Sequence, residues 1–223
     1  MELILDTGNV NEIKELYTIL PIDGVTTNPT IVAKEKKKFI ELIKEINDIV
    51  GEETPIHAQV ISTKYEEIIK EADFISSIRE NIYVKIPVTS EGLRAIKELS
   101  KRGKKITATA IFTAHQGFLA AKAGAAYVAP YVNRIDNISG DGVNTVRDLV
   151  SIIDRYNLNT KVLAASFKNA QQVLELMKVG VHSVTVPPDI AKAMMNHPLT
   201  EWSVNKFIED WEDAFGGGIK TWD

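Results

Sequence analysis

Residues 81–92 read "NIYVKIPVTSEG", which is the pattern of one strand, a turn and the start of a helix. Strand-forming residues give way to turn-forming ones, where Thr89 or Ser90 is suited to cap a helix and Glu91 falls in its first turn. The run also places Lys85 among residues typical of a strand that is buried on both faces. This raises two questions: how many such units the chain contains, and what a cation does inside one of them.

Similar units recur along the whole chain, because short β-rich runs alternate with longer segments of helical periodicity. The runs are Leu3–Leu5, Gly24–Thr27, Ile56–Val60, Ile82–Ile86, Ile106–Ala110, Tyr127–Pro130, Val162–Ala165 and Ser183–Val186. The segments between them are long enough for crossover helices. The sequence therefore predicts an α/β fold, a single (β/α)8 TIM barrel domain spanning residues 1–223.

The C-terminal segment, residues 198–215, predicts one helix more than the barrel needs. Its apolar residues recur at helical intervals and form a large apolar face for a terminal helix: Val204, Phe207, Ile208, Trp211 and Phe215. Two surfaces can cover that face, the parent barrel or a neighbouring subunit.

Composition excludes several classes of function. Hydrophobic residues make up 44% of the chain, and no apolar run approaches the roughly 18 residues of a membrane span. The chain has no cysteine, which excludes disulfides, thiolate metal sites and a cysteine nucleophile. The net charge is −4, and the one basic cluster is "KEKKK" at residues 34–38. The N-terminus carries acids where a secretory signal has Lys or Arg. We expect a cytoplasmic protein with no membrane or nucleic-acid partner.

The ends of the predicted strands carry the candidate functional groups, because working residues of a (β/α)8 barrel come from the C-terminal ends of its strands. Seven of the eight ends are polar, and the eighth, "VTVPP", is apolar. The polar residues are Asp6, Thr27 with Asn28, Gln59, Lys85, Thr109, Tyr131, and Ser166 with Lys168. Their convergence on one mouth predicts an active site there.

Lys85 is the candidate nucleophile. If Val84 and Ile86 pack outward against helices, the alternation of a strand points Lys85 into the barrel. Desolvation lowers the pKa of an interior amine, which suits it to attack a carbonyl and form a Schiff base. The alternatives are that Lys85 extends to the rim or pairs with Asp6. Asp6 is then either a proton-transfer group or only a counter-ion.

The other polar ends fit a small polyhydroxylated substrate. Asn28 and Ser166 can hydrogen-bond hydroxyl groups, while Gln59, Thr109 and Tyr131 can together hold one water. Such a water would shuttle protons beside Tyr131. The alternative for Tyr131 is an ordinary buried tyrosine with a satisfied hydroxyl.

Arg134 and Lys168 form a candidate phosphate site. They lie just beyond the sixth and seventh predicted strands, where barrels often bind an anion together with a backbone amide at a helix start. The alternative for these cations is a surface salt bridge to Asp136 or Asp141.

The sequence contains no motif for binding a metal or a nucleotide. His57, His115, His182 and His197 are isolated, without an H-E-x-x-H pattern or an acidic cluster, so we expect no metal. "SGDG" at residues 139–142 reads as a turn, and no glycine-rich phosphate loop follows a strand, so we expect no cofactor.

The segments "LDT", "GVTTNPT", "VKIPVTSEGLRAIK", "YVAPYVNRID" and "VLAASFKN" resemble, in order and across nearly the whole chain, the small transaldolase and fructose-6-phosphate aldolase family. The resemblance implies a (β/α)8 barrel, metal-free class I chemistry, and an imine between Lys85 and the dihydroxyacetone portion of a ketose phosphate. It also implies rings of five or ten subunits in which the C-terminal helix reaches a neighbour. The implied functional positions are Asp6, Asn28, Gln59, Lys85, Thr109, Tyr131, Arg134, Ser166 and Lys168.

Two positions separate activities within this family. Transaldolases that resemble this chain usually carry glutamate at the position of Gln59 and phenylalanine at that of Tyr131, so this chain is similar to the aldolase members. The expected reaction is reversible cleavage of fructose 6-phosphate to dihydroxyacetone and glyceraldehyde 3-phosphate. Two alternatives are transfer of the dihydroxyacetone unit to erythrose 4-phosphate and a non-catalytic sugar-phosphate binding barrel. Lys168 stands where transaldolases commonly have arginine, which predicts a weaker grip on phosphate.

Overall fold

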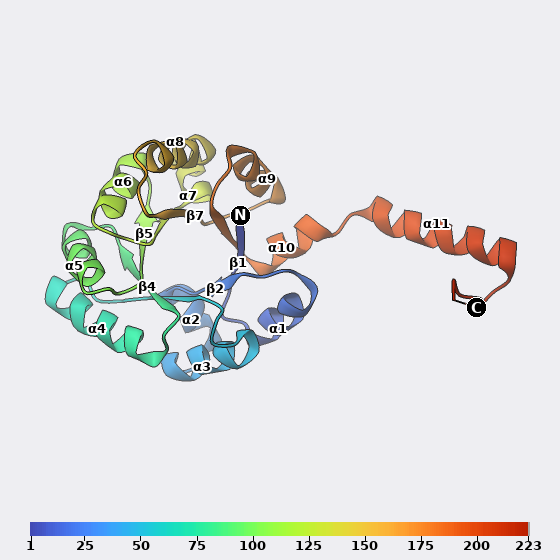
Figure 1. The fold of residues 1–223 in the computed structure, drawn as a ribbon, viewed down its shortest axis with the longest axis horizontal. Helices are drawn as coiled ribbons and strands as arrows, with labels where there is room; N and C mark the ends of the chain where they lie inside the picture. The colour runs from blue at the N-terminus through green and yellow to red at the C-terminus, as the bar shows by residue number, and fades with distance from the viewer. Residues whose placement is uncertain (223) are drawn as a thin grey trace.

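The chain forms a closed barrel of eight parallel strands in a computed structural model that describes residues 1–222 (Figure 1). The strands are β1 (Glu2–Asp6), β2 (Gly24–Thr26), β3 (Ile56–Gln59), β4 (Ile82–Pro87), β5 (Ile106–Ile111), β6 (Tyr127–Pro130), β7 (Lys161–Ala164) and β8 (Ser183–Val186). Each strand pairs with the next in the chain, and β8 returns to pair with β1. The predicted barrel is confirmed.

All described helices except the C-terminal one surround the barrel, and those that stand between strands connect them (Figure 1). They are α1 (Val10–Ile19), α2 (Pro29–Glu35), α3 (Phe39–Val50), α4 (Tyr65–Ile78), α5 (Ser90–Lys101), α6 (Ala114–Lys122), α7 (Val132–Asp136), α8 (Gly142–Arg155), α9 (Ala170–Val179), α10 (Pro188–Met195) and α11 (Pro198–Phe215). No described helix is long and apolar enough to cross a membrane.

The turn from β4 to α5 follows the sequence prediction. Thr89 is the N-cap of α5, and its Oγ1 accepts a hydrogen bond of 3.0 Å from the backbone N–H of Gly92. A Cβ atom at position 92 would lie 1.9 Å from the carbonyl oxygen of Pro87. Glycine is therefore the residue that lets α5 start this close to the end of β4.

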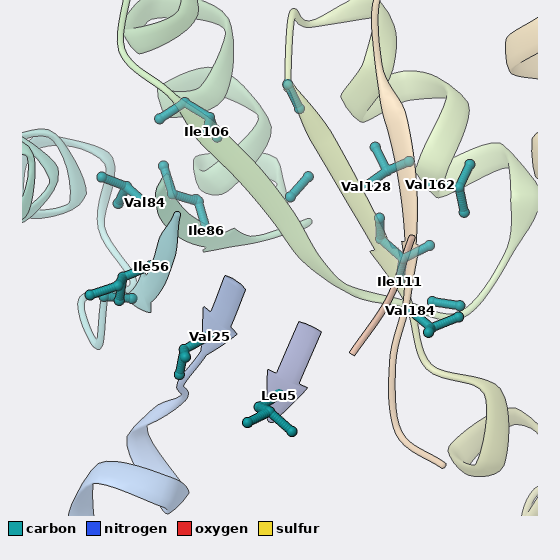
Figure 2. Packing of buried hydrophobic residues seen from close by; sticks show 14 of the residues in the cluster. Leu5, Val25, Ile56, Val84, Ile86, Ile106, Ile111, Val128, Val162 and Val184 are labelled. Atoms are coloured by element: carbon teal, nitrogen blue, oxygen red, sulfur yellow. The ribbon is translucent and has the colours of Figure 1, made fainter. Parts of the chain in front are cut away.

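Side chains alternate between the two faces of the barrel strands. The outer core packs under the helices and includes Val84, Ile86 and Ile106, which Figure 2 shows on neighbouring strands. A separate, smaller cluster that includes Ile4 and Leu163 fills the inside of the barrel. This alternation sends polar residues inward wherever they stand between two outer-core residues.

β5 breaks the alternation with a bulge. Its register to β6 shifts between Ala108 and Ile111, and Ala110 has a φ of 56°, in the left-handed region. Ala108 and Ile111 both pack in the outer core although three positions separate them. The extra residue therefore restores the outward packing of β5 after Thr109.

α11 extends away from the barrel (Figure 1). It has the predicted bounds, but none of its residues is buried, and Trp202, Phe207 and Phe215 are more than half exposed. The reading in which α11 packs on its own barrel is therefore wrong. Packing on a neighbouring subunit stays a prediction.

Candidate active site

The candidate residues lie at the carboxyl end of the barrel because all eight strands run in the same direction. Asp6 and Gln59 are the last residues of β1 and β3. Gln59 is the register partner of Lys85, and Thr109 is that of Pro87. The candidate side chains therefore come from the carboxyl-terminal parts of β1, β3, β4 and β5, and Tyr131 directly follows β6. We call Asp6, Gln59, Lys85, Thr109 and Tyr131 the mouth group.

Lys85 points into the barrel, as predicted from its place between two outer-core residues. It is 5% exposed, and its Nζ donates a hydrogen bond of 2.7 Å to the backbone oxygen of Thr27. Burial lowers the pKa of Lys85, and the negative charge of Asp6 opposes that shift. The side chain therefore does not extend to the rim, and burial favours its neutral, nucleophilic form.

Asp6 is held by a threonine that the sequence analysis did not single out. Thr26 Oγ1 donates a hydrogen bond of 2.7 Å to Asp6 Oδ1, and it also lies 2.6 Å from the Oγ1 of Thr185. The negative charge of Asp6 also acts on Lys85, so Asp6 serves as a counter-ion whether or not it transfers a proton. Strand alternation was the missed signal, because Thr185 stands between Val184 and Val186 and must face inward.

Thr27 has a different place from the one expected for a substrate-binding residue. It is fully buried, and its Oγ1 donates to the backbone oxygen of His57 at 3.2 Å. Val25 packs in the outer core, so alternation sends Thr26 inward and Thr27 outward. The backbone oxygen of Thr27 positions Lys85, while its side chain faces away from the barrel interior.

Two of the three predicted water-binding residues contact each other. The hydroxyl groups of Thr109 and Tyr131 lie 3.0 Å apart, and the ring of Tyr131 meets Phe112 edge to face. Gln59 hydrogen-bonds to neither of them, and its Oε1 is buried with no partner among the described residues. A buried acceptor without a partner can receive a hydrogen bond from a ligand.

Asn28 and Ser166, the predicted hydroxyl-binding residues, both form hydrogen bonds with backbone N–H groups. Asn28 Oδ1 accepts a hydrogen bond of 3.0 Å from the N–H of Ile31 as the N-cap of α2, which leaves its amide NH2 as the group that can meet a substrate. Ser166 has a φ of 65°, and its backbone oxygen accepts from the N–H of Asn133 at 2.8 Å. A left-handed serine beside the mouth is the kind of backbone strain that clusters at functional sites.

Arg134 lies on α7 with its guanidinium carbon 4.7 Å from the centre of the Tyr131 ring, a cation–π contact. The carboxylates considered as its alternative partners are used elsewhere. Asp136 accepts from Gly142 N–H and from Gln172 Nε2, both at 2.8 Å, and Asp141 caps α8. The exposed guanidinium is therefore available to an anion at the mouth.

Lys168 is exposed in the loop between β7 and α9. Its backbone N–H donates to Gln172 Oε1 at 2.9 Å, which holds the backbone of the loop. The ammonium group stands at the end of a flexible side chain. Of the two predicted phosphate cations, Arg134 is the one whose charged group contacts a mouth-group side chain.

Below the mouth group, a second polar layer fills the barrel. We call His57, Tyr83, Thr107 and Tyr127 the lower layer. His57 stacks on Tyr83 with ring centres 4.8 Å apart, and its Nδ1 lies 2.8 Å from Thr107 Oγ1. Burial, with a smaller effect of the Lys85 charge, lowers the pKa of His57 to about 3. His57 is therefore neutral near pH 7 and packs as part of the core.

Comparison with known proteins identifies the family. Residues 3–219 match the family described as Transaldolase/Fructose-6-phosphate aldolase. A probable transaldolase of Thermoanaerobacter sp. (strain X514) is 46% identical over 214 residues, which cover 96% of this chain and 98% of the relative. A probable transaldolase of Kosmotoga olearia is 45% identical over 213 residues, covering 96% of this chain and 97% of the relative.

Solved structures support the fold at much lower identity. A flavocytochrome b2 double mutant with pyruvate bound superposes with a TM-score of 0.61 at 11% identity, covering 86% of this chain and 57% of that one. At this identity the likeness concerns the fold alone. From the family match and the close relatives, the chain belongs to the transaldolase/fructose-6-phosphate aldolase family.

Proposed function

We propose that this member of the family is a class I aldolase that reversibly cleaves fructose 6-phosphate to dihydroxyacetone and glyceraldehyde 3-phosphate. The observation that carries the proposal is the buried Lys85 amine, whose pKa is lowered by burial at the substrate end of the barrel. A barrel that only binds sugar phosphates has no use for an interior amine.

The first steps form an imine on Lys85. The lone pair of Nζ attacks the C2 carbonyl of the ketose to give a carbinolamine, which loses its hydroxyl group as water. The hydrogen bond from Nζ to the backbone oxygen of Thr27 holds the amine in place before attack. The resulting protonated imine draws electrons from the C3–C4 bond.

Cleavage then requires a base at the C4 hydroxyl, and Asp6 is the candidate. Its carboxylate takes the C4 hydroxyl proton as the C3–C4 bond breaks, which releases glyceraldehyde 3-phosphate and leaves an enamine on Lys85. The hydrogen bond from Thr26 to Oδ1 orients the carboxylate and leaves Oδ2 for the substrate.

Release of dihydroxyacetone requires protonation of the enamine and hydrolysis of the imine. Thr109 and Tyr131, 3.0 Å apart, together with the unpartnered Gln59 Oε1, can hold the water for both steps. Asn28 and Ser166 would bind substrate hydroxyl groups, and Arg134 with Lys168 would bind the phosphate.

The second candidate is a transaldolase that passes the dihydroxyacetone unit from fructose 6-phosphate to erythrose 4-phosphate. The relatives at 43–46% identity are named probable transaldolases, which favours it. Gln59 and Tyr131 favour the aldolase, since a tyrosine hydroxyl beside the water speeds hydrolysis of the enamine before an acceptor arrives.

One steady-state experiment separates the two candidates. Release of glyceraldehyde 3-phosphate from fructose 6-phosphate is measured in EDTA, with and without erythrose 4-phosphate. Sustained release without acceptor supports the aldolase. A burst of one equivalent that continues only with acceptor supports the transaldolase, and no release in either arm together with no borohydride-trapped adduct on Lys85 contradicts both.

We also propose that the chain acts as one catalytic domain in a homopentamer or homodecamer. The exposed apolar face of α11, which includes Leu199, Trp202, Phe207 and Ile208, supports assembly through that helix. Sedimentation velocity of the intact chain and of the Phe207→Glu variant tests it. A monomeric intact chain at micromolar concentration would contradict the proposal.

A further inference from the structure

We propose that Thr185, on β8, is a positioning residue that fixes the carboxylate of Asp6 through the hydroxyl of Thr26. The inference rests on the proposed function, in which Asp6 moves the proton during C3–C4 cleavage. It gives a role to the eighth strand, the one whose end reads as apolar in the sequence.

The register of three neighbouring strands brings the three side chains together. β1 lies between β2 and β8, with Asp6 opposite Thr26 and Ile4 opposite Thr185. Thr26 and Thr185 are 0% and 1% exposed, so neither hydroxyl can turn to solvent for a partner. Each must satisfy its hydrogen bonds inside the barrel.

The direction of the hydrogen bonds follows from counting protons. An ionised carboxylate only accepts, so the single hydroxyl proton of Thr26 is the one that Asp6 Oδ1 receives at 2.7 Å. The contact of 2.6 Å between the hydroxyl oxygens of Thr26 and Thr185 must then use the proton of Thr185. The chain of donation runs in one direction, from Thr185 to Thr26 to Asp6.

This chain acts on Asp6 in two ways. A hydroxyl that accepts a hydrogen bond becomes a better donor, so Thr185 strengthens the bond that favours the ionised form of Asp6. The two short contacts also hold Thr26 in one rotamer, which fixes the direction of the carboxylate. Thr185 lies behind Thr26 and acts through it, with no need to touch the substrate.

Few other charges reach this part of the interior. Lys85 on β4 interacts with Asp6, and His57 on β3 interacts with Lys85. Glu2 and Lys161 form an ion pair with each other at the opposite end of their strands. A change at Thr185 therefore alters the environment of Asp6 without adding or removing a charge.

The test compares Thr185→Val with Thr185→Ser. Valine has the shape of threonine but cannot donate, and its methyl group cannot approach Thr26 Oγ1 to 2.6 Å. We expect kcat for cleavage to fall about tenfold, KM to change less than about twofold, and the acid limb of the kcat profile to move up by about half a pH unit. Serine, which keeps the donor, restores all three.

Ser183→Ala is the matched control. Ser183 faces inward on the same strand, but its hydroxyl donates to the backbone oxygen of Val162 at 3.0 Å and not toward Asp6. Its loss should leave the pH profile of kcat in place. If Thr185→Val does not fold, as judged by far-UV circular dichroism, Thr185→Ala removes the same donor and is expected to change kcat and its acid limb in the same directions.

Borohydride trapping with dihydroxyacetone separates failure of this inference from failure of the proposed function. Imine formation does not need the carbon–carbon bond to break, so the Thr185 variants should still give the Lys85 adduct. Absence of the adduct in the unmodified enzyme overturns the proposed function. A normal adduct with kcat and pH profile unchanged in the folded Thr185 variants overturns the role of Thr185 alone.

Discussion

The mouth group and the lower layer are two polar regions stacked inside one barrel, and each contains a buried group whose pKa is lowered. In the lower layer His57 is stacked on Tyr83 and paired with Thr107, and the Tyr127 hydroxyl donates to Glu2 at 3.0 Å. Each region also has a buried side-chain atom with no partner among the described residues, Gln59 Oε1 in the mouth group and His57 Nε2 in the lower layer. Burial and a shifted pKa are therefore common to both regions. The difference is that the mouth group stands at the strand ends, where a ligand can enter.

The strongest test of this difference is Lys85→Met, which keeps the length of the side chain and removes the nucleophile. We expect turnover of fructose 6-phosphate to fall by at least about a thousandfold, because the imine cannot form. Mass spectrometry after borohydride reduction should find no adduct. Lys105→Met is the control, since Lys105 is exposed and bonds to Asn81 at 3.1 Å. Near-normal activity in Lys85→Met would place the chemistry elsewhere.

Arg134→Met sharpens the assignment of the phosphate site. Methionine keeps an unbranched stem over the Tyr131 ring and removes the charge. We expect KM for fructose 6-phosphate to rise about tenfold, and KM for an unphosphorylated hydroxyketone to change little. Equal losses with both substrates would mean that Arg134 supports Tyr131 and does not bind phosphate.

Tyr131→Phe tests how the enamine is partitioned between water and an aldehyde acceptor. Loss of the hydroxyl that meets Thr109 should raise the ratio of transfer to cleavage about tenfold, measured with erythrose 4-phosphate as acceptor. Tyr17→Phe is the matched control, because the Tyr17 hydroxyl bonds to the backbone oxygen of Val50 outside the barrel. A ratio that is equal in the two variants would remove Tyr131 from the partition.

The smallest effect on activity is expected from the lower layer. Changing His57→Phe and Thr107→Val together removes both partners of one buried hydrogen bond, which is close to neutral for stability at neutral pH. We expect turnover to change less than about threefold. A loss comparable to that of Lys85→Met would break the comparison, because the lower layer would then take part in the chemistry.

The same double variant tests the linkage of His57 to acid stability. The folded-state pKa is lowered from 6.5 to about 3, so the unfolded chain binds the proton first as pH falls. The contribution of neutral His57 to the free energy of unfolding is fully present above pH 6.5. As pH falls from 6.5 to about 3, this contribution decreases by about 1.4 kcal/mol per pH unit. Urea unfolding of the double variant should show a flatter dependence in that window. If the free energy of unfolding depends on pH equally in the double variant and in the unmodified protein, the neutral state of His57 is contradicted.

The sequence predicts the barrel and the direction of Lys85 because both follow from local periodicity. The eight strands are short apolar runs, and alternation between Val84 and Ile86 places Lys85 inside. The same rule applied to "VTVPP" would have found Thr185, but the apolar appearance of the segment concealed it. Thr27 was misplaced because the strand end was judged by its last polar residue and not by the face on which that residue lies.

Other features depend on contacts that no local pattern encodes. The bulge at Ala110 is visible only once β5 is aligned with β6. Asp136 bonds to the nearby Gly142 and also to Gln172, which lies far along the chain. These contacts leave Arg134 without a carboxylate partner among the described residues. The apolar periodicity of residues 198–215 predicts the helix but not the surface that covers it, so the position of α11 away from its own barrel could not be predicted from the sequence.

The location of α11 also determines which part of the protein tryptophan fluorescence monitors. The chain has three tryptophans, and Trp202, Trp211 and Trp222 all lie on α11 or just after it. Because the barrel contains no tryptophan, the tryptophan emission of this chain describes the C-terminal segment, and the barrel is seen only through its tyrosines. A blue shift on raising the concentration would follow burial of the helix face. A change in tryptophan emission on heating would report on that segment, and it need not coincide with unfolding of the barrel.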